Sequence, residues 1–190
     1  MEEINKRIGY IYGSLKPITK GHFYLIETAS TECDEVNLFV SISDRIRDNE
    51  FPIKEKTMRK IWINHLFNVI PKNVNISFVN SPVKSVYELI GWYNENNDNK
   101  TKHIIYGDDF DVPKNFPEKY LNKYFDKLSS NKQIELKTFS RTETVDISGT
   151  KMRNYLQLGL MNAFIYGLPE PIQKNGKEIW ELFLKERYEN

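Results

Sequence analysis

The chain has 190 residues, of which 39% are hydrophobic and 28% charged, and its formal net charge is +1. This length and composition predict a single domain with a hydrophobic core, and the balanced charge gives no reason to expect nucleic acid as a partner. The single cysteine, Cys33, excludes an internal disulfide and any multi-cysteine metal site. The N-terminus lacks the apolar segment of a signal peptide, and no apolar run approaches the ~20 residues that span a bilayer. We therefore expect a cytoplasmic protein with no membrane partner.

Strands and helices are predicted to alternate along the first half of the chain. Residues 6–12, with an apolar run at 8–12, residues 36–42, and residues 74–79, where apolar and polar side chains alternate, are predicted strands. Residues 22 to about 31 and residues 53–69 carry apolar side chains at helical spacing. Ser81 is a good N-cap and Pro82 suits the first position of the helix that follows.

The second half continues the alternation. Residues 103–106 and 133–139 are predicted strands, residues 118–128 a helix, and residues 112–117 a proline-interrupted segment. Ser148 is expected to cap a helix beginning near Gly149, and residues 177–187 form a terminal helix. This order predicts an α/β fold: a Rossmann-like, doubly wound, parallel five-stranded sheet with helices on both faces. The domain core spans about residues 6–160, with a C-terminal helical extension over about residues 161–190.

Residues 13–22, Gly-Ser-Leu-Lys-Pro-Ile-Thr-Lys-Gly-His, join the first predicted strand to the first predicted helix. The N–H groups at a helix N-terminus and the positive end of the helix dipole attract anions. Gly13 allows a close approach of the backbone to a ligand, and Gly21 removes a Cβ at the start of the helix. Thr19 and His22 add side-chain donors, so this loop predicts a phosphate site.

Three further segments follow predicted strands. They are the charged loop at residues 43–52, Gly107-Asp108-Asp109, and residues 147–153, Ile-Ser-Gly-Thr-Lys-Met-Arg. In a parallel α/β sheet, ligands bind outside the carboxyl ends of the strands. We therefore expect these segments and the 13–22 loop to surround one ligand.

Two of these segments together resemble the signatures of the nucleotidylyltransferase superfamily. Residues 13–22 resemble its (H/T)xGH motif, and residues 147–153, about 125 residues later, resemble its ISxTxxR motif. The resemblance covers roughly residues 6–160 and is greatest to nicotinamide-mononucleotide and phosphopantetheine adenylyltransferases. It implies transfer of a nucleoside monophosphate from a triphosphate to a phosphate-bearing acceptor, with release of pyrophosphate.

The resemblance also implies roles for individual residues. His22 contacts the triphosphate and stabilises the transition state, and Thr19 stands where many relatives have a first histidine. Lys16 stands before a proline, where several branches of the superfamily have an acidic residue. Two alternatives are open for Lys16: it supplies a positive charge for phosphate, or it is a solvated surface residue. Ser148, Thr150 and Arg153 hold the β- and γ-phosphates. The remaining predicted nucleotide-binding residues are Gly13, Ser14, Gly21, Gly107, Asp108, Asp109, Ile147 and Gly149, and the predicted acceptor-binding residues are Arg45 and Arg47.

The expected partners are ATP or CTP and a small phosphorylated acceptor, with nicotinamide mononucleotide preferred. Arg141-Thr142-Glu143 resembles a cytidylyltransferase element, so cytidylyl transfer stays open, as do a phosphopantetheine acceptor and a catalytically inactive nucleotide-binding module. No protein metal site is expected, and Mg²⁺ is expected to arrive on the triphosphate. Relatives form dimers to hexamers, so the resemblance implies a homo-oligomer.

Overall fold

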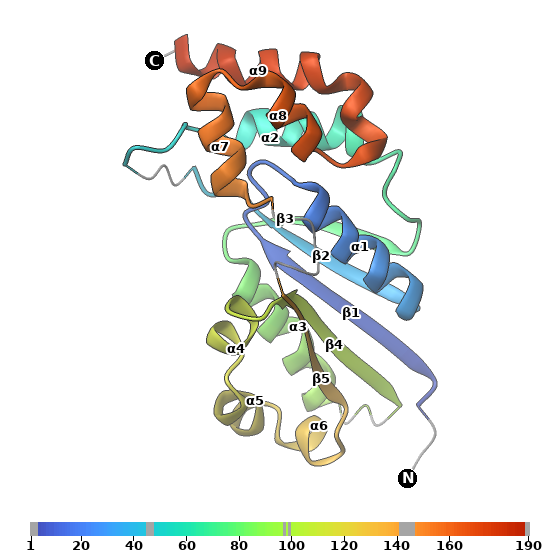
Figure 1. Ribbon diagram of the computed structural model, residues 1–190. Helices are drawn as coiled ribbons and strands as arrows, with labels where there is room; N and C mark the ends of the chain where they lie inside the picture. The colour runs from blue at the N-terminus through green and yellow to red at the C-terminus, as the bar shows by residue number, and fades with distance from the viewer. Residues whose placement is uncertain (1–3, 45–47, 97, 99, 141–146, 189–190) are drawn as a thin grey trace. The chain divides into compact units, whose positions relative to one another are not determined.

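The computed structural model describes residues 4–44, 48–96, 98, 100–140 and 147–188. Its strands are β1 (Lys6–Gly13), β2 (Glu35–Ser41), β3 (Val74–Val79), β4 (Thr101–Asp108) and β5 (Ile134–Phe139). The helices are α1 (Lys20–Glu32), α2 (Glu55–Ile61), the π-helical turn η1 (Trp62–Leu66), α3 (Pro82–Glu95), α4 (Asp111–Asn115), α5 (Glu118–Tyr124), α6 (Asp126–Ser130), α7 (Gly149–Leu158), α8 (Met161–Gly167), the 3₁₀ segment η2 (Glu170–Asn175) and α9 (Gly176–Tyr188). Figure 1 shows these elements.

The sheet has the predicted parallel five-stranded form, with strand order β3-β2-β1-β4-β5. Each neighbouring pair of strands is parallel. Strands β2 and β3 lie on one side of β1, and strands β4 and β5 lie on the other. The direction in which strands are added therefore reverses between β1 and β4. Such a switch point leaves a crevice at the carboxyl ends of the two strands. β1 ends at Gly13 and β4 at Asp108, one and two residues beyond the predicted strand ends at Tyr12 and Tyr106.

The chain divides into two compact units. The first comprises Met1–Gly13, Leu25–Ser41 and Pro71–Thr144, and the second comprises Ser14–Tyr24, Ile42–Ile70 and Val145–Asn190. The first unit therefore contains the whole sheet. The second contains the loop after β1, the first turn of α1, the α2–η1 segment and the C-terminal helices.

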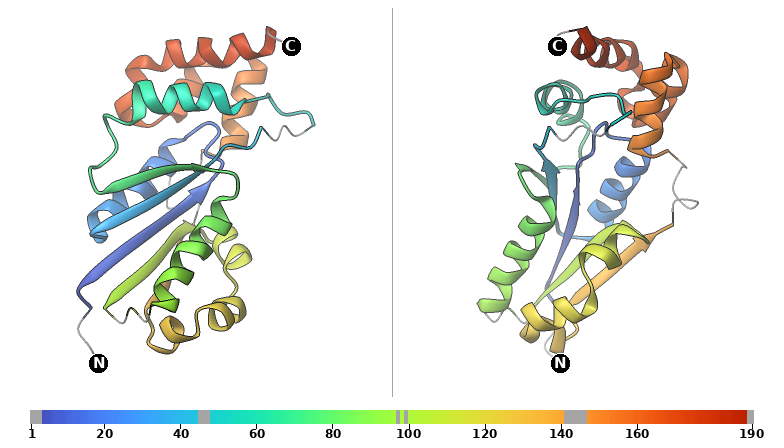
Figure 2. Two further views of the ribbon diagram at one scale, coloured as in Figure 1. Left: turned by 180° about the vertical axis from the view of Figure 1, so that it is seen from behind. Right: turned by 90° about the vertical axis from the view of Figure 1, so that its left-hand side faces the viewer.

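Alternating side chains build the core of the first unit. Ile8 and Tyr10 of β1 and Ile105 of β4 point to one face of the sheet, where they pack with Val86 and Ile90 of α3. Helices α4 to α6 add Phe116, Leu121, Phe125 and Leu128 to the same cluster. Helix α1 lies on the opposite face from α3 (Figure 2). Helices on both faces explain why the central strands are apolar on both sides.

Aromatic side chains dominate the core of the second unit. Phe164 of α8 packs edge-on against Trp180 and Phe183 of α9, with ring centroids 5.3 and 5.7 Å apart. Trp62 and Leu66 of η1 are fully buried. The C-terminal residues thus form a folded helical layer, in which the short helix α8 and the segment η2 were not predicted.

Two predicted helices are shorter or more broken than expected. The 118–128 helix is interrupted at Phe125, whose backbone leaves the helical region (φ −127°, ψ 50°) because its ring is buried in the cluster under α3. The side chain of Asn94 accepts hydrogen bonds from the N–H groups of Lys127 and Leu128, so α6 begins anew there. The 53–69 helix starts at Glu55, and its last helical element, η1, ends at Leu66, before Pro71.

Among the helices of the described residues, none combines the length and the apolar character that crossing a bilayer requires.

His103 of β4 is fully buried in the first unit, and its Nδ1 hydrogen-bonds the hydroxyl of Tyr10 at 2.8 Å. Burial lowers the pKa of His103 from 6.5 to about 4. Between pH 6.5 and pH 4, His103 is therefore protonated in the unfolded chain but neutral in the folded chain. The free energy of unfolding consequently falls as the pH drops through this range. We expect a loss of about 2 kcal/mol of unfolding free energy between pH 7 and pH 5 from this residue.

Urea unfolding followed by circular dichroism at both pH values checks this expectation. His103→Asn is the matched variant. It lacks the titrating group, and the unfolding free energy that it loses through poorer packing is the same at each pH. The variant should lose less stability than the wild type on acidification. Equal losses would contradict the assignment.

Candidate functional site

Thr19 and His22 form a reciprocal cap at the start of α1. The hydroxyl of Thr19 accepts the backbone N–H of His22 (3.3 Å), and the Nδ1 atom of His22 accepts the backbone N–H of Thr19 (3.1 Å). This is the geometry of a capping box, with histidine in the position that glutamate or glutamine normally takes. Thr19 is buried, at 1% exposure. The (H/T)xGH motif therefore has a structural role in ordering the loop before α1.

The same contacts determine what His22 offers to a ligand. Nδ1 accepts a backbone N–H, so the proton of the neutral ring is assigned to Nε2. The imidazole is thus oriented as a donor through Nε2. Gly21 and Lys20 stand at the first two positions of α1, where an α-helix leaves its N–H groups without internal acceptors. The start of α1 accordingly presents backbone and side-chain donors to an anion.

Helix α7 begins as the sequence predicted. Ser148 is its N-cap in extended conformation, and its hydroxyl accepts the N–H of Lys151 at 3.2 Å. Gly149 and Thr150 then occupy the first two helical positions, whose N–H groups lack intrahelical acceptors. The second motif therefore supplies a second helix N-terminus with the electrostatic character of an anion site.

Arg153 connects the two motifs within the second unit. One terminal nitrogen donates to the backbone carbonyl of Lys16 at 2.7 Å, and the other donates to the hydroxyl of Thr150 at 3.0 Å. Its Nε lies 2.9 Å from Oε2 of Glu50 in an ion pair whose side chains are only 15% and 18% exposed. Residues 16 and 153, which are distant in sequence, are thus held together by a guanidinium group. Figure 1 shows the start of α7 beside the loop after β1.

Gly149 leaves room for this contact. A Cβ at position 149 would lie 3.2 Å from a terminal nitrogen of Arg153 and 3.5 Å from the carbonyl oxygen of Lys16. The glycine therefore has a packing reason to stand at the variable position of the ISxTxxR motif.

Lys16 is buried at 7% exposure, so the alternative that it is a solvated surface residue is wrong. Its Nζ donates a hydrogen bond to the backbone carbonyl of Ser43. Leu15, immediately before it, has a left-handed φ of 47° and is also buried. Lys16 thus helps to hold the loop to the segment that follows β2, and its predicted role towards phosphate stays a prediction.

The Gly107-Asp108-Asp109 segment belongs to the first unit, where it has structural contacts. A Cβ at Gly107 would come within 2.6 Å of the Val112 side chain, so glycine is needed for α4 to pack on β4. Asp108 accepts the N–H groups of Phe110 and Asp111 at 2.9 and 2.6 Å, as a local cap. Asp109 is exposed. Ligand binding by this segment stays a prediction.

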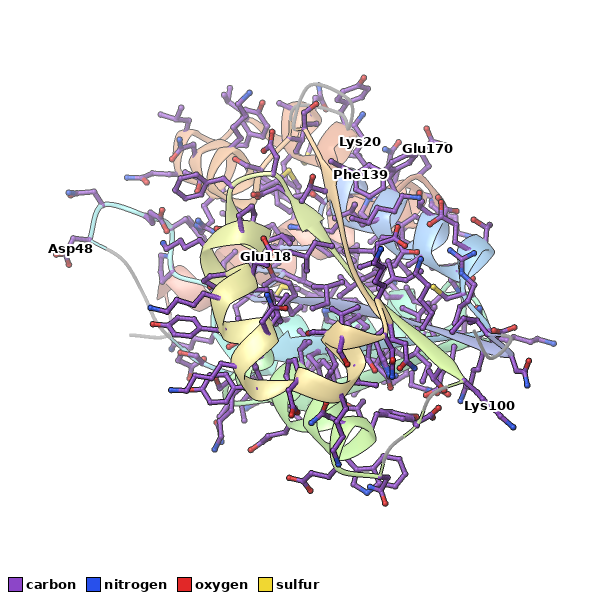
Figure 3. All side chains as sticks on the ribbon, turned by 90° about the horizontal axis from the view of Figure 1, so that it is seen from below. Lys20, Asp48, Lys100, Glu118, Phe139 and Glu170 are labelled. Carbon is purple, nitrogen blue, oxygen red and sulfur yellow. The ribbon has the colours of Figure 1, made fainter. Side chains whose placement is uncertain are left out.

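The predicted site residues are distributed over both units. Gly13, Gly107, Asp108 and Asp109 belong to the first unit, and Ser14, Lys16, Thr19, Gly21, His22, Ile147, Ser148, Gly149, Thr150 and Arg153 belong to the second. In Figure 3, Phe139 marks the carboxyl end of β5 and Lys100 the residue before β4. Arg45, Arg47 and Arg141-Thr142-Glu143 lie outside the described residues.

Two contacts of the second unit were not predicted. Glu50 is the acidic partner of Arg153. The ammonium of Lys20, the first residue of α1, stands 3.2 Å from the ring centroid of Tyr166 in α8. The position of Glu50 in the charged loop after the second strand was visible in the sequence, but nothing in the loop indicated its partner. Among the described residues, no group of three or more His, Cys, Asp or Glu side chains is placed to hold a metal ion.

The chain was compared in sequence and structure with known proteins, and the similar structures have the same fold. The citrate lyase ligase C-terminal domain family matches residues 8–83, which is less than half of the chain. No curated protein is significantly similar in sequence. A Vibrio parahaemolyticus protein assigned as a nicotinate-nucleotide adenylyltransferase is 18% identical, with a TM-score of 0.53 over 95% of this chain and 93% of its own.

The bifunctional NMN adenylyltransferase/ADP-ribose pyrophosphatase of Francisella tularensis is 13% identical, with a TM-score of 0.58 over 96% of this chain. The chain spans about half of that protein, 54% of its length. A second structure of the Francisella protein, with AMP and manganese bound, has a TM-score of 0.57 at 13% identity over 96% of this chain and 53% of that one. At these identities the likeness concerns the fold alone, which is the Rossmann-like α/β fold that the alternation of strands and helices predicted.

Proposed function

We propose that the protein is a nucleotidylyltransferase that transfers AMP from ATP to the phosphate of a small acceptor, such as nicotinamide mononucleotide. The observation that carries this proposal is the guanidinium of Arg153, which joins the two sequence motifs through the carbonyl of Lys16. Two helix N-termini and the ring of His22 come from these motifs. Together they supply the backbone and side-chain donors that a triphosphate requires.

In the proposed reaction, an acceptor phosphate oxygen attacks the α-phosphorus of ATP. The bond from the α-phosphorus to the oxygen bridging the β-phosphorus breaks, and pyrophosphate leaves. Nε2–H of His22 donates to a phosphate oxygen on which charge develops, and Ser148, Thr150 and Arg153 receive the β- and γ-phosphates. No covalent intermediate with the protein is needed, because positioning and charge neutralisation suffice.

Magnesium is proposed to accompany the triphosphate and to neutralise part of its charge. Mg²⁺ commonly keeps several waters and is bound by phosphate oxygens with one or two carboxylates. This mode of binding does not require a protein cage of three or more ligating side chains.

The preference for an adenylyl group and a pyridine mononucleotide is supported by the names of the structurally similar proteins. The alternatives are cytidylyl transfer, a phosphopantetheine acceptor and a nucleotide-binding module without catalysis. Pyrophosphate release should be measured with ATP and CTP, each combined with nicotinamide mononucleotide, nicotinate mononucleotide and phosphopantetheine. Turnover with ATP and a pyridine mononucleotide is expected. A melting-temperature shift on adding ATP, with no pyrophosphate from any pair, would instead favour the inactive binding module.

A further inference from the structure

The partners of Arg153 show a feature that phosphate binding alone does not explain. A guanidinium carries five N–H groups. In the part of the chain that the structure describes, one N–H on each terminal nitrogen is directed to Lys16 and Thr150, and the remaining nitrogen faces the carboxylate of Glu50. Two of these partners are neutral oxygens, and among the described partners Glu50 is the one that carries a negative charge.

We propose that Glu50 is an internal competitor for the anion at Arg153, so that it sets the affinity of the site for the triphosphate. The inference rests on the proposed function, in which Arg153 receives phosphate. A carboxylate and a phosphate oxygen have the same preference for a guanidinium. The triphosphate must therefore either displace Glu50 from Arg153 or bind beside a like charge.

The surroundings of the pair strengthen its effect. Both side chains are more than four-fifths buried, at 15% and 18% exposure, so solvent screens their charges less than it would at an open surface. When a ligand displaces the carboxylate, the hydrogen bonds to the carbonyl of Lys16 and the hydroxyl of Thr150 keep the guanidinium in place. Arg153 can then exchange one anionic partner for another while it continues to link the two motifs.

The carboxylate also limits which ligands can bind at Arg153. A ligand with one phosphate makes few contacts besides those to the guanidinium, whereas a triphosphate has several anionic oxygens and can also contact the helix N-termini. Displacing Glu50 costs either ligand the same free energy, so Glu50 lowers both affinities, and a ligand needs contacts elsewhere in the site to bind in spite of it.

The test is isothermal titration of the full chain with inorganic tripolyphosphate and with MgATP. Glu50→Gln keeps the shape of the side chain and a polar oxygen, but removes the charge. We expect Glu50→Gln to bind tripolyphosphate roughly tenfold more tightly, as removal of one nearby like charge predicts. Glu50→Asp keeps the charge and should stay near the wild type.

Asp48→Asn is the matched control. Asp48 is exposed and stands at the edge of its loop in Figure 3, so the variant changes net charge equally without touching Arg153. It should bind like the wild type. If Asp48→Asn tightens binding as much as Glu50→Gln, the change in net charge explains both results and the competitor role is wrong.

The outcomes separate this inference from the proposed function. If the wild type binds MgATP and releases pyrophosphate while Glu50→Gln binds no more tightly, the competitor role is wrong and the enzyme proposal stands. If only Glu50→Gln binds measurably, the competitor role is supported. If no variant binds tripolyphosphate or MgATP, both proposals are wrong. Should Glu50→Gln fold poorly, Glu50→Ala assayed at low temperature serves the same comparison.

Discussion

Arg153→Met is expected to lower the rate of pyrophosphate release by roughly 10²- to 10³-fold, because it removes a donor to the charge that develops in the transition state. The same change should destabilise the second unit by about 2 kcal/mol, since it removes the Arg153 cation from beside the partly buried carboxylate of Glu50. Trp62 and Trp180 are buried in that unit, and tryptophan fluorescence during urea unfolding measures the loss. Pyrophosphate release with saturating ATP measures the catalytic effect.

The double variant Glu50→Gln/Arg153→Met separates the two effects. Both charges of the pair are then gone, so most of the lost stability should return, whereas the activity should not. Recovery of activity in the double variant would show that Arg153 acts only by neutralising Glu50. A single variant that remains fully active would remove Arg153 from the proposed phosphate site.

The sheet and the helix starts could be predicted because their signals are local. Alternating or continuous apolar runs marked the five strands, and Ser148 marked α7 three residues before the N–H that its hydroxyl accepts. The break at Phe125 could not be predicted in this way. It depends on Asn94, more than thirty residues earlier in the chain, whose side chain caps α6 in place of a continuing helix.

The candidate site shows the same division between local and distant signals. The two motifs could be recognised in the sequence because each has particular residue types at a fixed spacing. The pairing of Glu50 with Arg153 and of Lys16 with the carbonyl of Ser43 joins residues that are 103 and 27 positions apart, respectively. No periodicity relates such positions, so only the folded chain reveals these contacts. The capping box was missed for a different reason, since histidine is not the residue that normally completes it.

That box has a consequence for the most important residue of the first motif. His22→Ala should abolish the Nδ1 contact to the N–H of Thr19, and loss of half a capping box costs about 1 kcal/mol of stability. It should also lower pyrophosphate release by roughly 10²- to 10³-fold, because the Nε2–H donor disappears. A reduced rate in this variant alone would therefore mix folding with chemistry.

His22→Gln resolves the ambiguity, because glutamine is one of the residues that normally complete a capping box. Its carbonyl can accept the N–H of Thr19, so the melting temperature should remain near that of the wild type. The amide cannot place a donor where the imidazole Nε2 stands, so turnover should remain low. If His22→Gln has wild-type stability and wild-type turnover, His22 is a cap and nothing more. Wild-type stability with turnover as low as in His22→Ala assigns the ring a direct part in the reaction.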